Sequence, residues 1–341
     1  MKKIVSLLLK YGIPIAVSVG LAYFLYTNVD IDAIATSLKQ DVNYWWFLPV
    51  IVVSTMSHVF RALRWRIQLK AVDVKPSLSA LVNSIFGTYF VNLLFPRLGE
   101  VWRCGYISSR EKAPFSLVLG SMVGDRLSDT LTVLLLTIFT FFLAGDKLTL
   151  FLGARGDGSS SGLLGSWVLW ACVALLVLGV LFAVWVVRSD SENPVVAKLR
   201  STLTSLWDGF AAIWRMDGKW LFLFYTVMIW GCYFMQLYIA SLAFSFTADL
   251  GVVAVLVLFV LSSLGMAVPS NGGLGPWQYA IIFGLTLYGI GSFPLSTPYD
   301  PQASAFAWLV WGVQTMLLIV LGIYAFISME VDRRRLAKKE K

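Results

Sequence analysis

The sequence is poor in charged residues, histidine and cysteine. Charged residues make up 13% of its 341 residues, against roughly 25% in soluble domains. There is one histidine, His58, and the three cysteines Cys104, Cys172 and Cys232 lie far apart. These counts argue against a soluble domain, a disulfide framework, and a metal site or catalytic triad built on histidine.

Hydrophobic residues are abundant, and they come in long runs. They make up 58% of the chain, and the mean hydropathy is +0.77. A spanning helix needs about 20 mainly apolar residues, which predicts six spans at residues 4–26, 44–60, 115–144, 166–187, 220–246 and 305–328. We expect the first run to be a retained helix, because no small-residue cleavage site follows it.

Basic residues cluster on one side of these spans. They lie before the first span, after the second, around residues 103–112, in the central loop and in the C-terminal tail, which places both termini in the cytoplasm. The net charge of +8 therefore reflects basic residues in the cytoplasmic loops and tails, and it does not indicate nucleic-acid binding. The expected location is the bacterial cytoplasmic (inner) membrane.

Three shorter apolar segments, at residues 78–95, 252–268 and 277–290, border breaks rich in proline and glycine. The first is flanked by basic residues on both sides and should dip into the membrane and return. The other two begin and end on the outer side, near Asp249 and Asp300, and should form a hairpin. The alternative is that both breaks are ordinary loops between short helices.

The two halves of the chain therefore share one plan with opposite orientation. We predict an all-α polytopic membrane protein of about six full spans plus re-entrant or broken helices, arranged as two inverted-topology repeats. A single membrane domain covers residues 1–341, with repeats at 1–148 and 163–330. An amphipathic cytoplasmic helix at 199–215 and a basic cytoplasmic tail at 331–341 complete it.

The long span that begins near residue 115 carries three charged residues, Asp125, Arg126 and Asp129. A charge at mid-bilayer costs ~2.5–3.5 kcal/mol, so these side chains must face protein or a water-filled cavity. Helix geometry pairs Arg126 with Asp129 and stacks Asp125 over Asp129. They form either a structural cluster that locks neighbouring helices or a substrate or proton site.

The two breaks supply further candidate residues. Arg97, Glu100 and Arg103 follow the first break, where arginines and a new helix start would suit an anion such as phosphate; the alternative is that the arginines reach lipid headgroups. The second break contains Asn271, Gly272, Gly273 and Gly275, followed by Gln278, and its glycines leave amides for an anion. Arg61, Arg64, Trp65 and Arg66 are interpreted as an interface anchor.

Three motifs stand out along the chain: Pro96-Arg97-Leu98-Gly99-Glu100 with Arg103, Gly124-Asp125-Arg126-Leu127-Ser128-Asp129, and Pro269 with Gly272-Gly273-Leu274-Gly275. Together they resemble the lysylphosphatidylglycerol synthase transmembrane, or flippase-like, family. In the family's best-understood members, the multiple peptide resistance factors, this domain moves aminoacylated phosphatidylglycerol between leaflets, and a separate domain makes the lipid. Two departures from the family pattern stand out. Asp125 replaces a common Glu, which is a conservative change. Gln278 replaces a common Glu or His, and the loss of an ionisable group there puts a lysyl-lipid substrate in doubt.

The resemblance implies a stand-alone member without the synthase domain, which acts as a flippase for a polar, phosphate-containing lipid headgroup. The expected partner is a membrane phospholipid or a prenyl-linked lipid, with a homo-oligomer left open. We expect no cofactor, metal or catalytic residue. The predicted substrate-binding residues are Arg97, Glu100, Arg103, Asp125, Arg126, Asp129, Asn271, Gly272, Gly273, Gly275 and Gln278. The alternatives are an integral-membrane lipid-modifying transferase and a non-transporting accessory subunit.

Overall fold

A computed structural model describes residues 23, 27, 30–95, 97–144, 185–188, 196–197, 200, 216–268, 270–291 and 299–339. Contacts divide the chain into two compact units, residues 1–125 with 220–341, and residues 126–219. The predicted spans at 4–26 and 166–187 and the amphipathic helix at 199–215 lie almost entirely outside the described residues.

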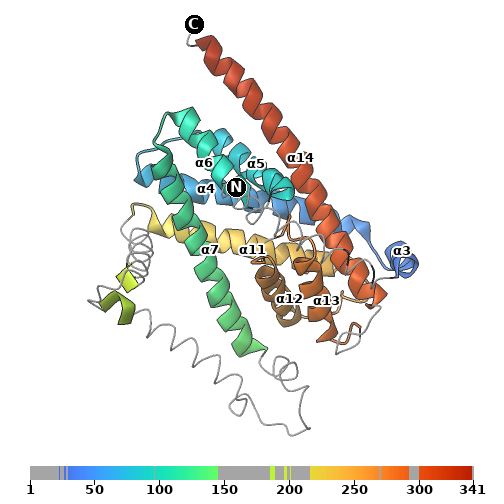
Figure 1. The fold of residues 1–341 in the computed structure, drawn as a ribbon. Coiled ribbons are helices and arrows are strands. Elements are labelled where there is room, and N and C mark those ends of the chain that lie inside the picture. Colours follow the sequence, from blue (N-terminus) through green and yellow to red (C-terminus); the bar gives the residue numbers. More distant parts are fainter. Residues whose placement is uncertain are drawn as a thin grey trace, which may run out of the picture. The chain divides into compact units, whose positions relative to one another are not determined.

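Four described helices are long and apolar enough to cross a membrane. They are α4 (Phe47–Ala71), which follows the short 3-10 helix η2 (Tyr44–Trp46), α7 (Phe115–Leu143), α11 (Lys219–Ser241) and α14 (Pro301–Lys339) (Figure 1). Each corresponds to one of the predicted spans. The prediction of an all-α, multi-pass membrane protein is thus confirmed.

Two of these helices run further than the hydrophobic pattern predicted. α4 was expected to end near residue 60 and reaches Ala71, and α14 was expected to end near residue 328 and reaches Lys339. The added segments contain no proline or glycine, and Glu330 accepts from Arg334 at 2.8 Å one turn later. Lys, Arg, Leu and Ala favour helix, so the helix continues where the hydrophobic run stops.

A short helix that the hydrophobic pattern did not predict, α3 (Ile31–Gln40), precedes η2. The Asp30 side chain accepts a hydrogen bond from the Ala33 amide at 3.0 Å, which satisfies one of the orphan donors at the helix start. Beyond α3, an isolated bridge pairs Val42 with Phe244, just after α11. It ties the start of α4 to the end of α11.

Four shorter helices form two hairpins. α5 (Leu78–Leu94) is followed by α6 (Leu98–Glu111), and α12 (Val252–Gly265) is followed by α13 (Pro276–Thr286). At ~1.5 Å per residue, even α5 is about 25 Å long, less than the ~30 Å hydrocarbon core. A single helix of either hairpin is therefore shorter than the hydrocarbon core, and the re-entrant course stays a prediction.

Glycines let the helices of each hairpin lie close together. A Cβ at Gly99 would collide with the backbone carbonyl of Thr88, so the start of α6 packs directly on α5. In the second hairpin a Cβ at Gly265, the last residue of α12, would lie 2.8 Å from the backbone oxygen of Pro276 at the start of α13. Both hairpins therefore need glycine, which has no side chain, at these close contacts.

The two hairpins lie along α14 with their turns toward each other. Near the C-terminal end of α14, Ser328 Oγ accepts from the Asn83 amide at 2.8 Å, which places the first hairpin there. In the N-terminal half of α14, the Trp311 indole donates to the carbonyl of Gly272, within the second turn, at 2.9 Å. The span within α14 covers Pro301–Arg334, so the second turn lies toward its middle.

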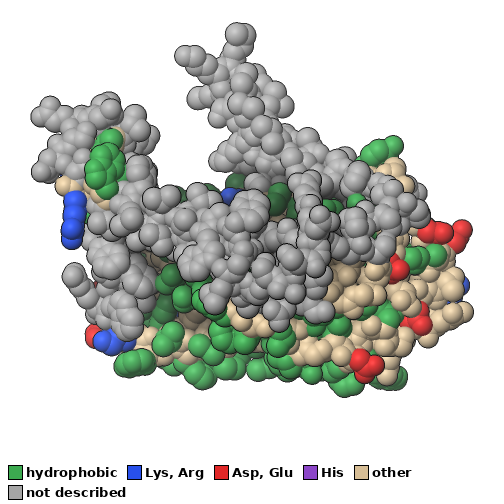
Figure 2. All heavy atoms as spheres, turned by 90° about the horizontal axis from the view of Figure 1, so that it is seen from below, with side chains coloured by type: hydrophobic (Ala, Val, Ile, Leu, Met, Phe, Trp, Pro, Cys, Tyr) green, Lys and Arg blue, Asp and Glu red, His purple; other side chains and the backbone are tan. Residues whose placement is uncertain are grey.

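On the face shown in Figure 2, hydrophobic side chains cover much of the described surface, and charged side chains lie toward its edges. Large hydrophobic side chains are exposed on α4, α11 and α14, among them Val52, Val227 and Val320. Such a surface suits lipid rather than water. The division into inverted repeats at 1–148 and 163–330 stays a prediction.

Candidate functional site: a buried arginine cluster

One face of α4 carries polar side chains along most of its length, and it is buried. Ser54, Ser57, His58, Arg61, Arg64 and Gln68 are each at most 7% exposed. Their spacing of three or four residues puts them on one side of the helix. The sequence analysis did not detect this face, although the 3–4 spacing of polar residues inside a hydrophobic run was a usable signal.

Asp125 of α7 is the centre of an ion-pair cluster. Arg64 donates to Asp125 Oδ1 from Nε at 3.0 Å and from a terminal nitrogen at 2.6 Å, and both side chains are 0% exposed. Arg103 of α6 donates to Oδ2 at 3.3 Å, and Arg61 lies 3.7 Å from the same oxygen. Three guanidinium groups from two helices therefore converge on one carboxylate.

The indole of Trp65 packs against the guanidinium group of Arg103. The Arg103 guanidinium carbon lies 4.4 Å from the Trp65 ring centroid, a cation–π distance. The indole nitrogen donates to Ser121 Oγ at 3.0 Å, which fixes the ring. Trp65 thus holds Arg103 in place beside Asp125.

Phenol hydroxyls extend the cluster toward the rest of the polar face of α4. Arg61 donates to the hydroxyl of Tyr233 on α11 at 3.1 and 3.3 Å. The Tyr233 hydroxyl lies 3.3 Å from that of Tyr89 on α5, and the Tyr89 ring packs 4.6 Å from His58. Polar contacts therefore run from Asp125 through Arg61 and Tyr233 to Tyr89, whose ring packs against His58.

These contacts correct the interpretation of the α4 arginines as an interface anchor. Arg61 is 4% exposed, and Arg64 and Trp65 are 0% exposed, whereas an anchor would lie at the headgroup level. Charge pairing with Asp125 explains the difference, because a buried guanidinium is tolerated when a carboxylate meets it. Arg66, in the same motif, is partly buried.

The first break places its residues at the turn between α5 and α6. Arg97 adopts a left-handed backbone conformation with φ 60°, and its guanidinium donates to the carbonyl of Ala267 at 2.9 Å. Glu100 accepts from the Asn92 amide at 3.2 and 3.3 Å. Arg103 lies six residues after Arg97, about 9 Å along the chain axis of α6.

The second break meets the first. The Asn271 amide donates to the carbonyls of Leu93 and Leu94 at 3.3 and 3.4 Å. A Cβ at Gly272, where φ is +59°, would lie 2.5 Å from Leu93 Cδ2. The two interruptions that the sequence placed at matching positions of the two halves are thus in direct contact.

One amide of the glycine run that the sequence offered to an anion already has a partner within the chain. The Gly275 amide donates to the Gln278 side-chain oxygen at 2.8 Å, and Gln278 is 0% exposed. This amide is therefore used to begin α13. Gly272, Gly273 and Gly275 all have positive φ, which explains why the turn needs glycine.

Arg126 and Asp129 belong to the second unit and pair at 3.6 Å, as the i,i+3 spacing predicted. Their side chains are 36% and 13% exposed. Asp125, the last residue of the first unit, engages the arginines of α4 and α6. Among the predicted site residues of the first unit, the structure joins Arg103 to Asp125 and Arg97 to the second break.

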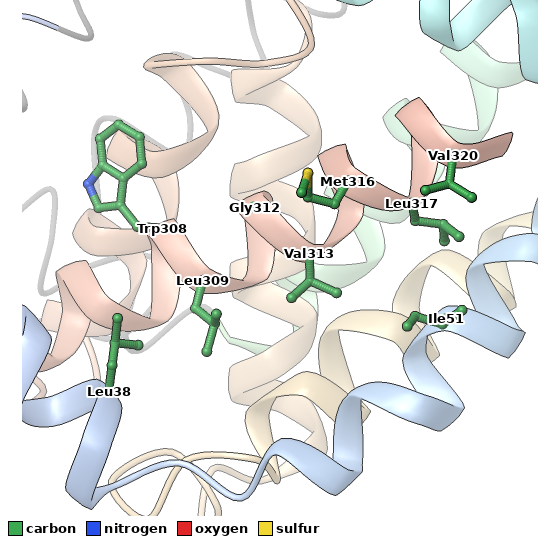
Figure 3. Close-up of a pocket in the computed structure, with 9 residues that line it drawn as sticks. All are labelled: Leu38, Ile51, Trp308, Leu309, Gly312, Val313, Met316, Leu317 and Val320. Carbon is green, nitrogen blue, oxygen red and sulfur yellow. The ribbon is translucent and has the colours of Figure 1, made fainter. Parts of the chain in front are cut away.

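An open groove of about 700 Å³ lies elsewhere in the first unit, between α14, α3 and α4. Figure 3 shows Leu309 and Val313 of α14 pointing toward the side where Leu38 and Ile51 lie. The groove is lined by apolar side chains, with one glycine. It suits hydrocarbon, whereas the arginine cluster suits an anion.

The chain was compared with known proteins. It matches the family model described as the lysylphosphatidylglycerol synthase TM region over residues 12–322. No curated protein and no solved structure matches the chain. The matched segment covers most of the sequence and includes both breaks and the whole arginine cluster. The chain therefore belongs to the lysylphosphatidylglycerol synthase transmembrane-region family and is a lipid-related, multi-pass membrane protein.

Proposed function

We propose that the protein is a flippase that moves a phosphate-bearing lipid headgroup between leaflets, past the cluster around Asp125. The observation that carries this proposal is the convergence of three buried guanidinium groups on one carboxylate. Ionisable groups inside membrane helices are costly and are retained where they serve a pathway or a site. Guanidinium groups are well suited to phosphate, which they bind bidentately.

The two hairpins support an alternating pathway. Basic residues flank α5–α6 (Lys75 before it, Lys112 after it), and acidic residues flank α12–α13 (Asp249 before it, Asp300 after it). By the positive-inside rule the first hairpin enters from the cytoplasm and the second from the outside, with both termini cytoplasmic. Hairpins that enter from opposite faces and touch at their turns are a natural gate near the midplane.

The cluster is closed in this structure, since Arg64, Arg103 and Asp125 are 0% exposed. A headgroup reaches it only when the helices around it move apart. Hydrogen bonds from Arg97 to the Ala267 carbonyl and from Asn271 to the Leu93 carbonyl join the two hairpin turns. We infer that these turns part during transport while the lipid tails stay in the bilayer.

Transbilayer movement of labelled lipids in reconstituted vesicles tests this proposal. The wild-type protein should carry headgroup-labelled phospholipid to the outer leaflet, where dithionite reduces the label. Asp125→Asn should slow this movement strongly, and Arg334→Gln, on an exposed side chain, should not. Vesicles that move none of a broad panel of phospholipids and prenyl phosphates would refute the proposal.

The proposal assigns the protein no catalytic step. A transferase would need a nucleophile with a base or a metal, and within the described ranges no group of three His, Cys, Asp or Glu residues could hold a metal ion. Incubation of the purified protein with lipid donors, followed by mass spectrometry, separates the two functions. A modified lipid product would favour the transferase.

A further inference from the structure

We propose that the lipid phosphate has a second binding site near the middle of the membrane helices, separate from the arginine cluster. Side chains of α4, α5 and α11 form this midspan site: His58, Tyr89, Trp230 and Tyr233. The inference rests on the proposed function and adds an intermediate position to the pathway of the headgroup.

The polar face of α4 extends further along the helix than the arginine cluster needs. From Ser54 to Gln68 it covers ~21 Å, about two-thirds of the ~30 Å hydrocarbon core. His58 lies at the middle of the 28-residue span Tyr44–Ala71. Arg64 lies six residues later, about 9 Å further along the helix. Polar side chains inside a membrane helix are costly, so those around His58 need a function or a partner of their own.

Two buried nitrogen atoms near this level have no hydrogen-bond partner among the described residues. They are Nδ1 of His58, whose side chain is 5% exposed, and Nε1 of Trp230, at the middle of α11. An indole nitrogen only donates, and a neutral imidazole can carry its proton on Nδ1 when an acceptor lies beside it. A buried polar group without a partner costs ~1–3 kcal/mol. A ligand rich in acceptor oxygens would recover this energy.

Both nitrogens belong to rings that pack against a pair of phenols. The His58 ring centroid lies 4.6 Å from that of Tyr89, and the Trp230 ring centroid lies 5.9 Å from that of Tyr233. The hydroxyl oxygens of the two tyrosines lie 3.3 Å apart. These contacts bring donor groups from three helices into one neighbourhood.

The charged residues around the midspan site favour an anion over a cation. The four helices α4, α5, α11 and α12 contain no acidic residue, so a bound amine or metal ion would find no carboxylate on them. The Arg61 guanidinium donates to the Tyr233 hydroxyl at 3.1 Å and brings a positive charge to the edge of the site. Phosphate oxygens accept strong hydrogen bonds from N–H and O–H groups. The chemistry of the site therefore fits a lipid phosphate.

Each hairpin contributes one aromatic wall to the midspan site. The His58 ring centroid lies 6.1 Å from that of Phe86 on α5, in the first hairpin. The Trp230 ring centroid lies 6.0 Å from that of Phe259 on α12, in the second hairpin. The site is closed in this structure, since His58 is buried. Separation of the hairpins, which the proposed function requires, would open it to a headgroup.

Nitrogen-15 NMR of the protein labelled only in histidine tests this inference without any transport step. The chain contains one histidine, so the spectrum reports on His58 alone. The purified protein is titrated with phosphatidic acid, phosphatidylglycerol and a polyprenyl phosphate. Diacylglycerol, which has the tails and no phosphate, is the control. At least one phosphate lipid should shift the Nδ1 signal to saturation, and diacylglycerol should not. A signal that none of the three phosphate lipids shifts would overturn the inference.

Variants of two tryptophans on α11 distinguish direct contact from a distant effect on His58. Trp230→Phe removes the indole N–H and keeps an aromatic ring against Phe259. The lipid concentration at half-maximal shift should therefore rise about tenfold or more, as expected for a hydrogen bond to a charged group. Trp220→Phe, at a position that is 69% exposed on the same helix, should leave the titration unchanged. An unchanged titration in Trp230→Phe would also overturn the inference.

Transport by His58→Phe separates this inference from the proposed function. The variant keeps a ring between the neighbouring aromatic side chains and loses both nitrogens, so phospholipid movement in vesicles should slow about tenfold or more. A lipid-dependent His58 shift with no movement by the wild-type protein would support the midspan site and remove the flippase. Movement at the wild-type rate by His58→Phe would leave the flippase in place and remove the midspan site from its pathway.

Discussion

Removal of the Asp125 carboxylate should destabilise the protein more than removal of any one arginine around it. Asp125→Ala leaves three buried guanidinium groups without the oxygens that now lie 2.6, 3.3 and 3.7 Å away. Breaking a buried ion pair by removal of one partner costs about 3–5 kcal/mol. We expect a loss in the free energy of unfolding in that range or above it.

The distances also predict how this energy is divided. Charge-assisted hydrogen bonds contribute ~1.5–3 kcal/mol each, and Arg64 makes two to the carboxylate oxygen Oδ1, while Arg103 makes one to Oδ2. The coupling energy with Asp125 should therefore be ~3 kcal/mol or more for Arg64 and ~1.5 kcal/mol for Arg103. Arg61, at 3.7 Å, should couple by less than ~1 kcal/mol.

Three double-mutant cycles measure these energies, with Asp125→Ala combined in turn with Arg→Met at each position. The assay is unfolding in mixed micelles of increasing SDS content, followed by tryptophan fluorescence. The exposed pair of Glu330 and Arg334, 2.8 Å apart, is the matched control and should couple by only ~0.3–0.5 kcal/mol. Equal coupling in the three cycles, or the largest coupling at Arg61, would refute the ranking.

Two further predictions concern the first hairpin. Gly99→Ala should cost ~1–3 kcal/mol of stability, because the added methyl group meets the backbone of α5. Gly105→Ala is the control: nothing lies within 4 Å of its Cβ, so it should be neutral or stabilising in the same unfolding assay. Equal losses in the two variants would contradict the close packing of α5 and α6. Cys104 is 0% exposed, so maleimide should label it only after denaturation. Rapid labelling of Cys104 in the folded protein would contradict the buried position of this face of α6.

Much of this architecture follows from the sequence because it depends on strong local signals. Long hydrophobic runs predict α4, α7, α11 and α14, and proline and glycine predict both hairpin turns. The pairing of Arg126 with Asp129 needs only helix geometry, and the structure confirms it at 3.6 Å. In each case the residues that carry the signal are neighbours in the chain.

The arginine cluster could not be predicted in the same way, because its partners are far apart in sequence. Arg64 and Asp125 are 61 residues apart, and charge near the end of a hydrophobic run is equally typical of an interface anchor. Only the burial of α4 between α5 and other helices distinguishes the two. The basic end of α4 was also predicted to lie in a loop. A hydrophobic pattern shows where a helix leaves the membrane, but the helix itself can continue beyond that point.

The most direct test of transport past the cluster is a reversible cross-link between the two hairpin turns. The native cysteines are first replaced by serine, and Leu93→Cys and Asn271→Cys then introduce one cysteine in each turn. These positions are close, because the side-chain amide of Asn271 lies 3.3 Å from the backbone carbonyl oxygen of Leu93. We predict that oxidation of this pair stops phospholipid movement in vesicles and that reductant restores it. Undiminished movement with the cross-link formed would contradict the account, because a headgroup would then pass without the turns parting.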